Sequence, residues 1–167
     1  MKSRRIIVLG IILAVAAVGQ IIFSFVLYNQ DGVDWVRNLG WIVLAISGIF
    51  GWLPIYTLRR KGGVAEGESY VRTTELVDSG IYSAVRHPQY LAGVLMNLAL
   101  SLIAQHWLVA TLGAVAGITY YPSAVYEEKA SIEKFGETYQ RYMERVPRMN
   151  VILGIIWQVC RHTPGEG

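Results

Sequence analysis

Apolar residues gather in four long stretches, which are separated by short polar segments. The stretches cover residues 6–28, 39–58, 88–104 and 107–121. A helix that crosses a bilayer needs roughly 17–25 residues, so we expect the first two stretches to span it comfortably. The last two lie at or below the lower limit, and only Gln105 and His106 separate them. This spacing predicts a tight helical hairpin that barely crosses the membrane.

The pattern of apolar positions changes after Pro122. Between residues 124 and 146, apolar residues recur every three or four positions with charged residues among them, at Ile132, Phe135, Tyr139, Tyr142 or Met143, and Val146. This spacing predicts an amphipathic helix on the cytoplasmic side or at the membrane interface. Pro147 ends the pattern. Residues 151–159 are again apolar but are too few to span, so we expect them on the membrane or against the bundle.

The composition also indicates a membrane protein. Of the 167 residues, 53% are hydrophobic and only 16% are charged, whereas a soluble domain carries about 25% charged residues. The first apolar stretch is longer than the ~7–15 residues of a signal-peptide core, so we expect it to be retained. The sequence predicts an all-α, polytopic integral membrane helical bundle in a single domain, with about four transmembrane helices and one cytoplasmic amphipathic helix.

The distribution of basic residues predicts the orientation. Fourteen of the fifteen lysines and arginines lie within residues 2–5, 59–86 and 129–161, and only Arg37 lies in the loop between the first two spans. The positive-inside rule then places both termini and residues 59–87 in the cytoplasm. Anionic lipid headgroups account for the net charge of +3, so no nucleic acid partner is expected.

Common signatures of soluble enzymes are absent from the sequence. The chain has no G-x-G-x-x-G, P-loop, G-x-S-x-G or H-E-x-x-H motif. Its single cysteine, Cys160, excludes an intrachain disulfide and a cysteine-type zinc site, and we expect no metal. His106 and His162 stand alone in polar surroundings, so we assign them no function.

Arg86 and His87 stand directly before the third apolar stretch. One interpretation is that they anchor a helix start near the lipid headgroups. The other is functional, because charge beside lipid is costly and tends to mark a site. That reading needs a partner cluster, and Glu127 and Glu128 supply one after the fourth stretch. Alternatively, these glutamates form a solvated helix turn, although Glu128 lines up with Ile132 on the apolar stripe.

One face of the third stretch carries small and polar residues. Tyr90, Gly93, Asn97 and Ser101 recur at spacings of three and four, so they share one face of a helix. An asparagine in an apolar helix is expected to point at protein or at a cavity, away from lipid. We therefore regard Asn97 as a candidate substrate contact.

Several of these residues recur in an order that resembles a known family. The order is Leu76-Val77, Gly80, Tyr82, Arg86-His87-Pro88, Tyr90, Glu127-Glu128, Phe135-Gly136, Tyr139, Tyr142 and Val146-Pro147-Arg148. It resembles the isoprenylcysteine carboxyl methyltransferase family, which is related to the membrane phospholipid methyltransferases. The resemblance covers residues 74–148, and the first two spans match only in hydropathy.

The resemblance implies S-adenosylmethionine as cofactor and names its contacts. Carried over by motif, they are Thr74, Glu75, Leu76, Val77, Tyr82, His87, Pro88, Gln89, Tyr90 and Glu127, to which helix geometry adds Glu128. A glutamate suits the ammonium group or the ribose hydroxyls, and His87 at a helix start suits the carboxylate. His87 and Arg86 are the candidate catalytic residues.

Two positions depart from the family pattern. Ala92 stands where the family often has glycine, with Gly93 following. Ser123 stands where the prenylcysteine enzymes have an arginine that holds the substrate carboxylate. We retain Ser123 as a candidate substrate contact and consider Arg86 as a substitute partner for that carboxylate.

The expected acceptor is a lipophilic molecule that enters from the bilayer. Carboxyl methylation of a prenylated cysteine or a similar lipophilic acid is the activity that the resemblance favours. N-methylation of a phospholipid amine is the alternative enzyme activity. A membrane scaffold or sensor that retains the fold without turnover is the alternative outside catalysis.

Overall fold

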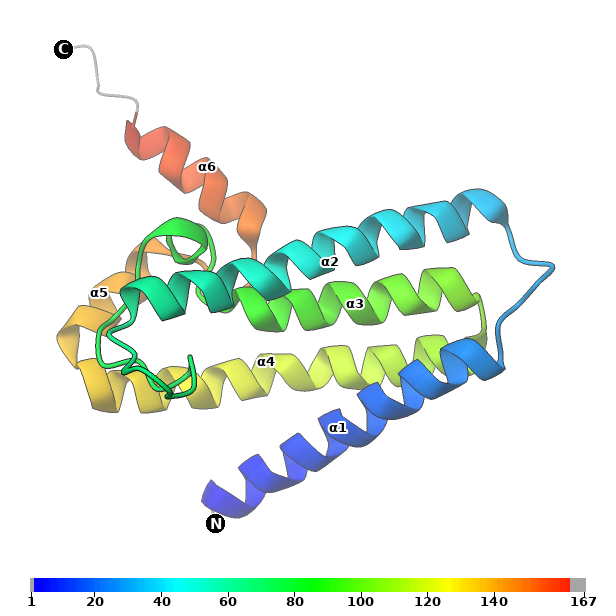
Figure 1. Ribbon diagram of the computed structural model, residues 1–167, viewed down its shortest axis with the longest axis horizontal. Helices are drawn as coiled ribbons and strands as arrows, with labels where there is room; N and C mark the ends of the chain where they lie inside the picture. Colours follow the sequence, from blue (N-terminus) through cyan, green and yellow to red (C-terminus); the bar gives the residue numbers. More distant parts are fainter. Residues whose placement is uncertain (1, 163–167) are drawn as a thin grey trace. The chain divides into compact units, whose positions relative to one another are not determined.

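The computed structural model describes residues 2–162 of the chain, and Figure 1 shows its helices. They are α1 (Lys2–Val26), α2 (Asp34–Lys61), the short 3-10 helix η1 (Gly80–Ser83), α3 (Pro88–Ala104), α4 (Trp107–Phe135), α5 (Glu137–Arg145) and α6 (Val151–His162). No strand occurs among residues 2–162. The prediction of an all-helical fold is therefore confirmed.

Among residues 2–162, three helices are long and apolar enough to cross a membrane. They are α1 over Arg4–Val26, α2 and α4, while α3 is apolar but has only 17 residues. Large apolar side chains on the first two helices point outward, since Val15 is 68% exposed, Phe25 79% and Trp52 71%. A protein surrounded by water rarely exposes so many large apolar side chains on one surface. These helices therefore belong to a membrane bundle, as the sequence predicts.

Helix α4 continues past Pro122 to Phe135, where the sequence analysis separates an apolar stretch from an amphipathic helix. Proline lacks an N–H group, so Pro122 removes the helical hydrogen bond to the carbonyl of Ile118. The helix continues despite this loss. It ends before Gly136, whose φ of +58° favours glycine, and α5 then begins at Glu137.

The helices form two compact units. The first comprises Met1–Phe50 and Tyr90–Glu127, and the second comprises Gly51–Gln89 and Glu128–Gly167. Their boundaries fall within α2, within α4 and near the start of α3. Each unit has its own internal contacts.

Polar and small residues hold the first unit together. Gln20 Nε2 donates to the main-chain oxygen of Asn97 at 2.8 Å and to Ser101 Oγ at 3.2 Å, which joins α1 to α3. Ser47 Oγ of α2 donates to the main-chain oxygen of Ala92 at 2.9 Å. A Cβ atom at Gly113 of α4 would lie 2.3 Å from Gln20 Nε2. Small residues at such positions let membrane helices approach closely.

Aromatic residues of α5 form the core of the second unit. Tyr139, Tyr142 and Val146 are buried together, with Leu76, Ile132, Phe135 and Met143 packed against them. The hydroxyl group of Tyr142 donates to the main-chain oxygen of Tyr82 at 2.7 Å. Burial raises the pKa of Tyr142, so its hydroxyl group stays protonated and remains a donor. The apolar stripe seen in the sequence between residues 132 and 146 therefore packs into the core of the second unit.

Candidate functional site

A buried carboxylate, Glu128, is the centre of a charged cluster in the second unit. Its side chain is 3% exposed. Arg148 contacts it with both arms, because Nε donates to Oε1 at 2.9 Å and Nη2 donates to Oε2 at 2.6 Å. His87 Nε2 lies 3.3 Å from the same Oε1. A bidentate guanidinium pair of this kind is among the strongest hydrogen-bonded contacts in proteins.

The main chain brings these side chains together. The N–H groups of Arg86 and His87 donate to the carbonyl oxygens of Pro147 and Arg148, each at 3.0 Å. The two segments thus lie side by side for two residues. Pro88 then opens α3, where a missing N–H group costs little. These main-chain hydrogen bonds and the start of α3 therefore fix the backbone positions from which the Arg86 and His87 side chains extend.

Arg86 is the least satisfied member of the cluster. Its side chain is 9% exposed, and Nη1 lies 3.1 Å from Glu128 Oε1. That distance makes an ion pair, but the angle does not give a hydrogen bond. Within the described part of the chain, Nε and Nη1 of Arg86 have no hydrogen-bond partner. Buried donors without partners are costly, so the guanidinium group is suited to an additional anionic ligand.

The charges of the cluster do not cancel. One carboxylate, Glu128, faces the guanidinium groups of Arg86 and Arg148 and the imidazole ring of His87. The sum of the charges of these four side chains is positive even when the imidazole ring is neutral. The predicted site residues did not include Arg148, although its motif, Val146-Pro147-Arg148, was part of the resemblance. Its separation of 20 residues from Glu128 gave no local signal of the pairing.

Glu127 lies in the first unit and has a different partner. Its carboxylate accepts a hydrogen bond from the hydroxyl group of Tyr90. The ring of Tyr90 packs against that of Tyr120 with centroids 5.7 Å apart. The side chain of Glu127 is otherwise exposed. An exposed carboxylate can accept bonds from a cation or from sugar hydroxyls.

Gly93 explains part of the departure from the family pattern. A Cβ atom there would lie 2.3 Å from the ring of Tyr120, within the first unit. Ala92 is itself buried at 7% exposure and carries its methyl group without difficulty. The glycine that the helix contact requires is therefore Gly93, one residue later than the position where the family often has it.

The predicted contacts at 74–77 belong to a compact turn of the second unit. The N–H groups of Thr74 and Glu75 both donate to the carbonyl oxygen of Gly62, at 2.8 and 3.2 Å. Thr74 Oγ1 donates to the carbonyl oxygen of Gly63 at 2.8 Å. Val77 is buried. Among the other predicted contacts, Pro88 is fully buried and Tyr82 and Gln89 are partly buried.

The two predicted substrate contacts lie in the first unit. Asn97 is 2% exposed, in accord with the expectation that it avoids lipid, and both polar atoms of its side chain lack a partner among the described residues. Ser123 Oγ donates to the main-chain oxygen of Thr119 at 2.8 Å, within its own helix. No hydrogen bond joins Asn97 to Ser123 in the part of the chain that is described. Nothing cationic takes the place of the family arginine within α4 over 120–126.

The fold and the cluster define a class of protein. A helical bundle with spans of membrane length carries a buried, positively charged site close to the start of an apolar helix. Ionisable groups in such a place are characteristic of function in membrane proteins. In the described residues, no three histidine, cysteine, aspartate or glutamate side chains gather to hold a metal ion.

Comparison with known families identifies the group. The family model described as phospholipid methyltransferase matches residues 35–138, more than half of the chain. The chain therefore belongs to the phospholipid methyltransferase family and is a membrane methyltransferase that acts on a lipophilic substrate. This confirms the resemblance noted in the sequence, since that family is related to the isoprenylcysteine carboxyl methyltransferases. No curated protein matches the chain.

Proposed function

We propose that this protein transfers a methyl group from S-adenosylmethionine to a lipophilic acceptor that reaches it from the bilayer. The observation that carries the proposal is the buried Arg86 guanidinium, whose Nε and Nη1 atoms lack acceptors among the described residues. The nearby Glu128 is already held by Arg148 and His87. An additional anionic group beside this guanidinium would supply an acceptor to a buried donor that lacks one.

The residues present fit the chemistry of this cofactor. In the first unit, Glu127 offers a carboxylate, steadied by Tyr90, to an ammonium group or to ribose hydroxyls. In the second unit, His87 suits the carboxylate of the cofactor, which leaves the Arg86 guanidinium for a carboxylate of the acceptor. The remaining contacts that we propose are Thr74, Glu75, Leu76, Val77, Tyr82, Pro88 and Gln89. Glu128 acts by fixing the positions of Arg86 and His87.

When bound, S-adenosylmethionine supplies an electrophilic methyl group whose bond to sulfur breaks as the bond to the acceptor forms. The protein has little covalent chemistry to perform in such a displacement. Holding the acceptor in line and excluding water account for most of the acceleration. A carboxylate acceptor reacts without losing a proton, so no general base is required. Arg86 would orient that carboxylate.

The first acceptor class that we propose is a lipophilic carboxylate, such as that of a prenylated cysteine. The second is a phospholipid amine, which the family description favours. Ser123, which stands in place of the family arginine and bonds to its own helix, also favours the second class. An amine acceptor must arrive deprotonated or lose its proton at the site, which gives the two classes different dependence on pH.

We also propose that both termini and residues 59–87 face the cytoplasm, because basic residues concentrate there. Single cysteines at Glu66 and Gln30, in a Cys160→Ser background, test this with a membrane-impermeant reagent. Both positions are exposed. Labelling of Glu66→Cys from the outside of intact cells would contradict the orientation.

Methyl-labelled S-adenosylmethionine tests the activity. Purified protein is incubated with it and with membrane lipid extracts, and the labelled product is treated with base. A base-labile label identifies an ester and therefore a carboxylate acceptor, while a stable label identifies an amine or a thioether. Binding of the cofactor without any transfer would leave a non-catalytic membrane protein and would overturn the proposal.

Two arginine variants connect the activity to the cluster. Arg86→Gln should lower the transfer rate at least about tenfold, the loss expected for a charged hydrogen bond. Arg145→Gln is the matched control, because Arg145 is exposed and pairs with Asp78 at 3.7 Å in the same unit. Arg86→Lys keeps the charge but loses the two-armed geometry, so its rate should fall between them. Equal rates in all three variants would contradict the role of Arg86.

A further inference from the structure

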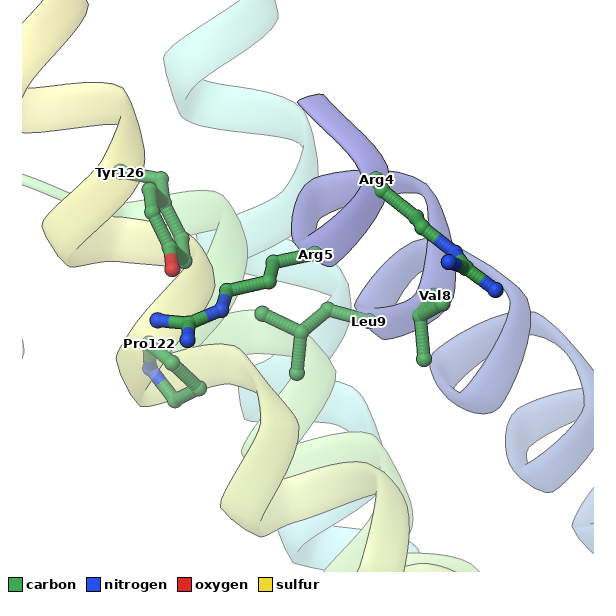
Figure 2. Close-up of a pocket in the computed structure, with 6 residues that line it drawn as sticks. All are labelled: Arg4, Arg5, Val8, Leu9, Pro122 and Tyr126. Carbon is green, nitrogen blue, oxygen red and sulfur yellow. The ribbon is translucent and has the colours of Figure 1, made fainter. Parts of the chain in front are cut away.

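A cavity of about 500 Å³ lies in the first unit, between the start of α1 and the later part of α4. Its lining consists of Arg4, Arg5, Val8, Leu9, Pro122 and Tyr126, which Figure 2 draws as sticks. Pockets for small ligands commonly measure about 300–1,000 Å³, so this volume holds a headgroup and the first part of a chain. None of these residues belongs to the predicted methyl-transfer site.

The positive charge of this cavity is uncompensated. Both arginines are exposed, and α1 carries no acidic residue in its first turn. Figure 2 shows Arg5 reaching from α1 toward Pro122 and the hydroxyl end of Tyr126, while Arg4 lies beside Val8. Within the described residues, no carboxylate pairs with either guanidinium group. Figure 2 shows the Arg4 side chain pointing away from Pro122 and Tyr126, so Arg5 is the cation that faces them and can attract an anion there.

The walls below the arginines are apolar. Val8 and Leu9 follow Arg4 and Arg5 by four positions, so each arginine lies above an aliphatic side chain on the same face of α1. On the other side, Pro122 contributes a ring and no N–H group. The cavity therefore combines a cationic opening with a hydrocarbon floor. A free anion would satisfy only the opening, whereas an amphiphile satisfies both parts.

We propose that this cavity binds one anionic phospholipid from the surrounding bilayer. The phosphate group lies at Arg5, Arg4 adds positive charge on the same helix, and the upper part of an acyl chain runs along Val8, Leu9 and Pro122. Arginine suits phosphate because its planar group offers two parallel donors. A zwitterionic lipid would bring a cationic headgroup toward two arginines and is disfavoured. The proposal does not depend on methyl transfer, since it uses none of the residues assigned to that reaction.

Lipid titration of the purified full-length chain tests the site. Phosphatidylglycerol and phosphatidylcholine with identical acyl chains are added to the protein in detergent, and native mass spectrometry measures the fraction that retains one lipid. Phosphatidylglycerol should bind about tenfold more tightly, because it gains charged hydrogen bonds without a repelling ammonium group. Equal affinity for the two lipids would overturn the proposal.

Matched variants separate a specific site from general attraction to a basic surface. Arg4→Gln/Arg5→Gln should lower phosphatidylglycerol affinity about tenfold, while Arg59→Gln/Arg60→Gln removes the same charge elsewhere and should change it less than about twofold. Leu9→Trp keeps all charges but fills the cavity, and it should also weaken binding. Equal losses in the two double variants, or full binding by Leu9→Trp, would overturn the proposal. Displacement of the lipid by equimolar inorganic phosphate would identify a phosphate site and would also overturn it.

Discussion

The two units bury polar groups in different ways. In the first unit the buried polar side chains are neutral, and Gln20 and Asn97 keep amide atoms without partners among the described residues. In the second unit a full negative charge is buried, and Glu128 is contacted by two guanidinium groups and one imidazole ring. The same chain therefore leaves buried amides unpaired in one place and pairs both oxygens of its buried carboxylate, Glu128, in the other.

The difference follows from the cost of burial. An unpaired buried amide costs about 1–3 kcal/mol. The packing of the apolar helices can offset a cost of this size. An unpaired buried carboxylate costs several kcal/mol, and the protein must supply cations to hold it. The surplus of cations around Glu128 then leaves Arg86 with open donors. The buried interior of the first unit is consequently suited to neutral contacts, and the buried cluster around Glu128 is suited to an anion.

The largest effect should come from breaking the pair that holds Glu128. Arg148→Ala removes both bidentate hydrogen bonds and leaves a buried carboxylate with Arg86 and His87 alone, so the free energy of unfolding should fall by about 3 kcal/mol. Denaturant unfolding in micelles, followed by circular dichroism, measures this loss. Arg141→Ala is the control, because Arg141 and Glu137 are 73% and 83% exposed and such pairs contribute less than about 1 kcal/mol. Equal stability of the two variants would show that the cluster does not stabilise the fold.

The two adjacent glutamates sharpen the comparison. Glu127→Gln should weaken the binding of S-adenosylhomocysteine at least about tenfold with little loss of stability, since this side chain is exposed. Glu128→Gln should instead lower stability, because the guanidinium groups of Arg86 and Arg148 lose their counterion. Calorimetric titration measures the affinity of each variant for S-adenosylhomocysteine, and denaturant unfolding measures its stability. Unchanged affinity in both variants would show that Glu127 and Glu128 form a helix turn without a role in cofactor binding.

A smaller effect is expected at Tyr142. Tyr142→Phe removes the hydroxyl group that donates to the carbonyl of Tyr82 but keeps the ring in the core. Stability should fall by about 1 kcal/mol, the usual contribution of one neutral hydrogen bond. Because burial raises the pKa of Tyr142, its hydroxyl group stays protonated in alkaline solution, and the difference from the parent should not change between pH 7 and pH 9. A difference that disappears at pH 9 would contradict this assignment.

The spans could be predicted from sequence because hydropathy is a local property. Long apolar runs form helices whatever they contact, as the run that begins at Ile6 does within α1 (Lys2–Val26). The continuation of α4 through Pro122 could not be predicted in the same way. A proline normally ends or bends a helix, and whether its neighbours make up for the lost hydrogen bond depends on packing that the local sequence does not record.

The candidate site was predictable in its residue types but not in its pairing. The Arg86-His87 and Glu127-Glu128 motifs were evident, and their roles in binding stay predictions. The partner of Glu128 is Arg148, and only the folded chain brings the two together. Which of the two glutamates is buried and which is exposed depends on the side of α4 that each one faces. Periodicity favoured Glu128 for the apolar stripe, and Glu128 is indeed the buried one.

The smallest effect on stability should come from Asn97, where the first unit leaves an amide unpaired. Asn97→Leu keeps the main-chain oxygen that accepts from Gln20 and Ser101, and it removes two polar atoms that have no partner among the described residues. Stability should therefore stay the same or rise by up to about 1 kcal/mol. If Asn97 contacts the acceptor, the KM for the lipophilic substrate should rise while stability is unchanged. Ser101→Ala is the control, because Ser101 Oγ accepts from Gln20 and donates to the Asn97 carbonyl, and its loss should lower stability slightly. A loss of more than about 1 kcal/mol in Asn97→Leu would show that the amide is satisfied within the bundle, and the contrast between the two units would then reduce to charge alone.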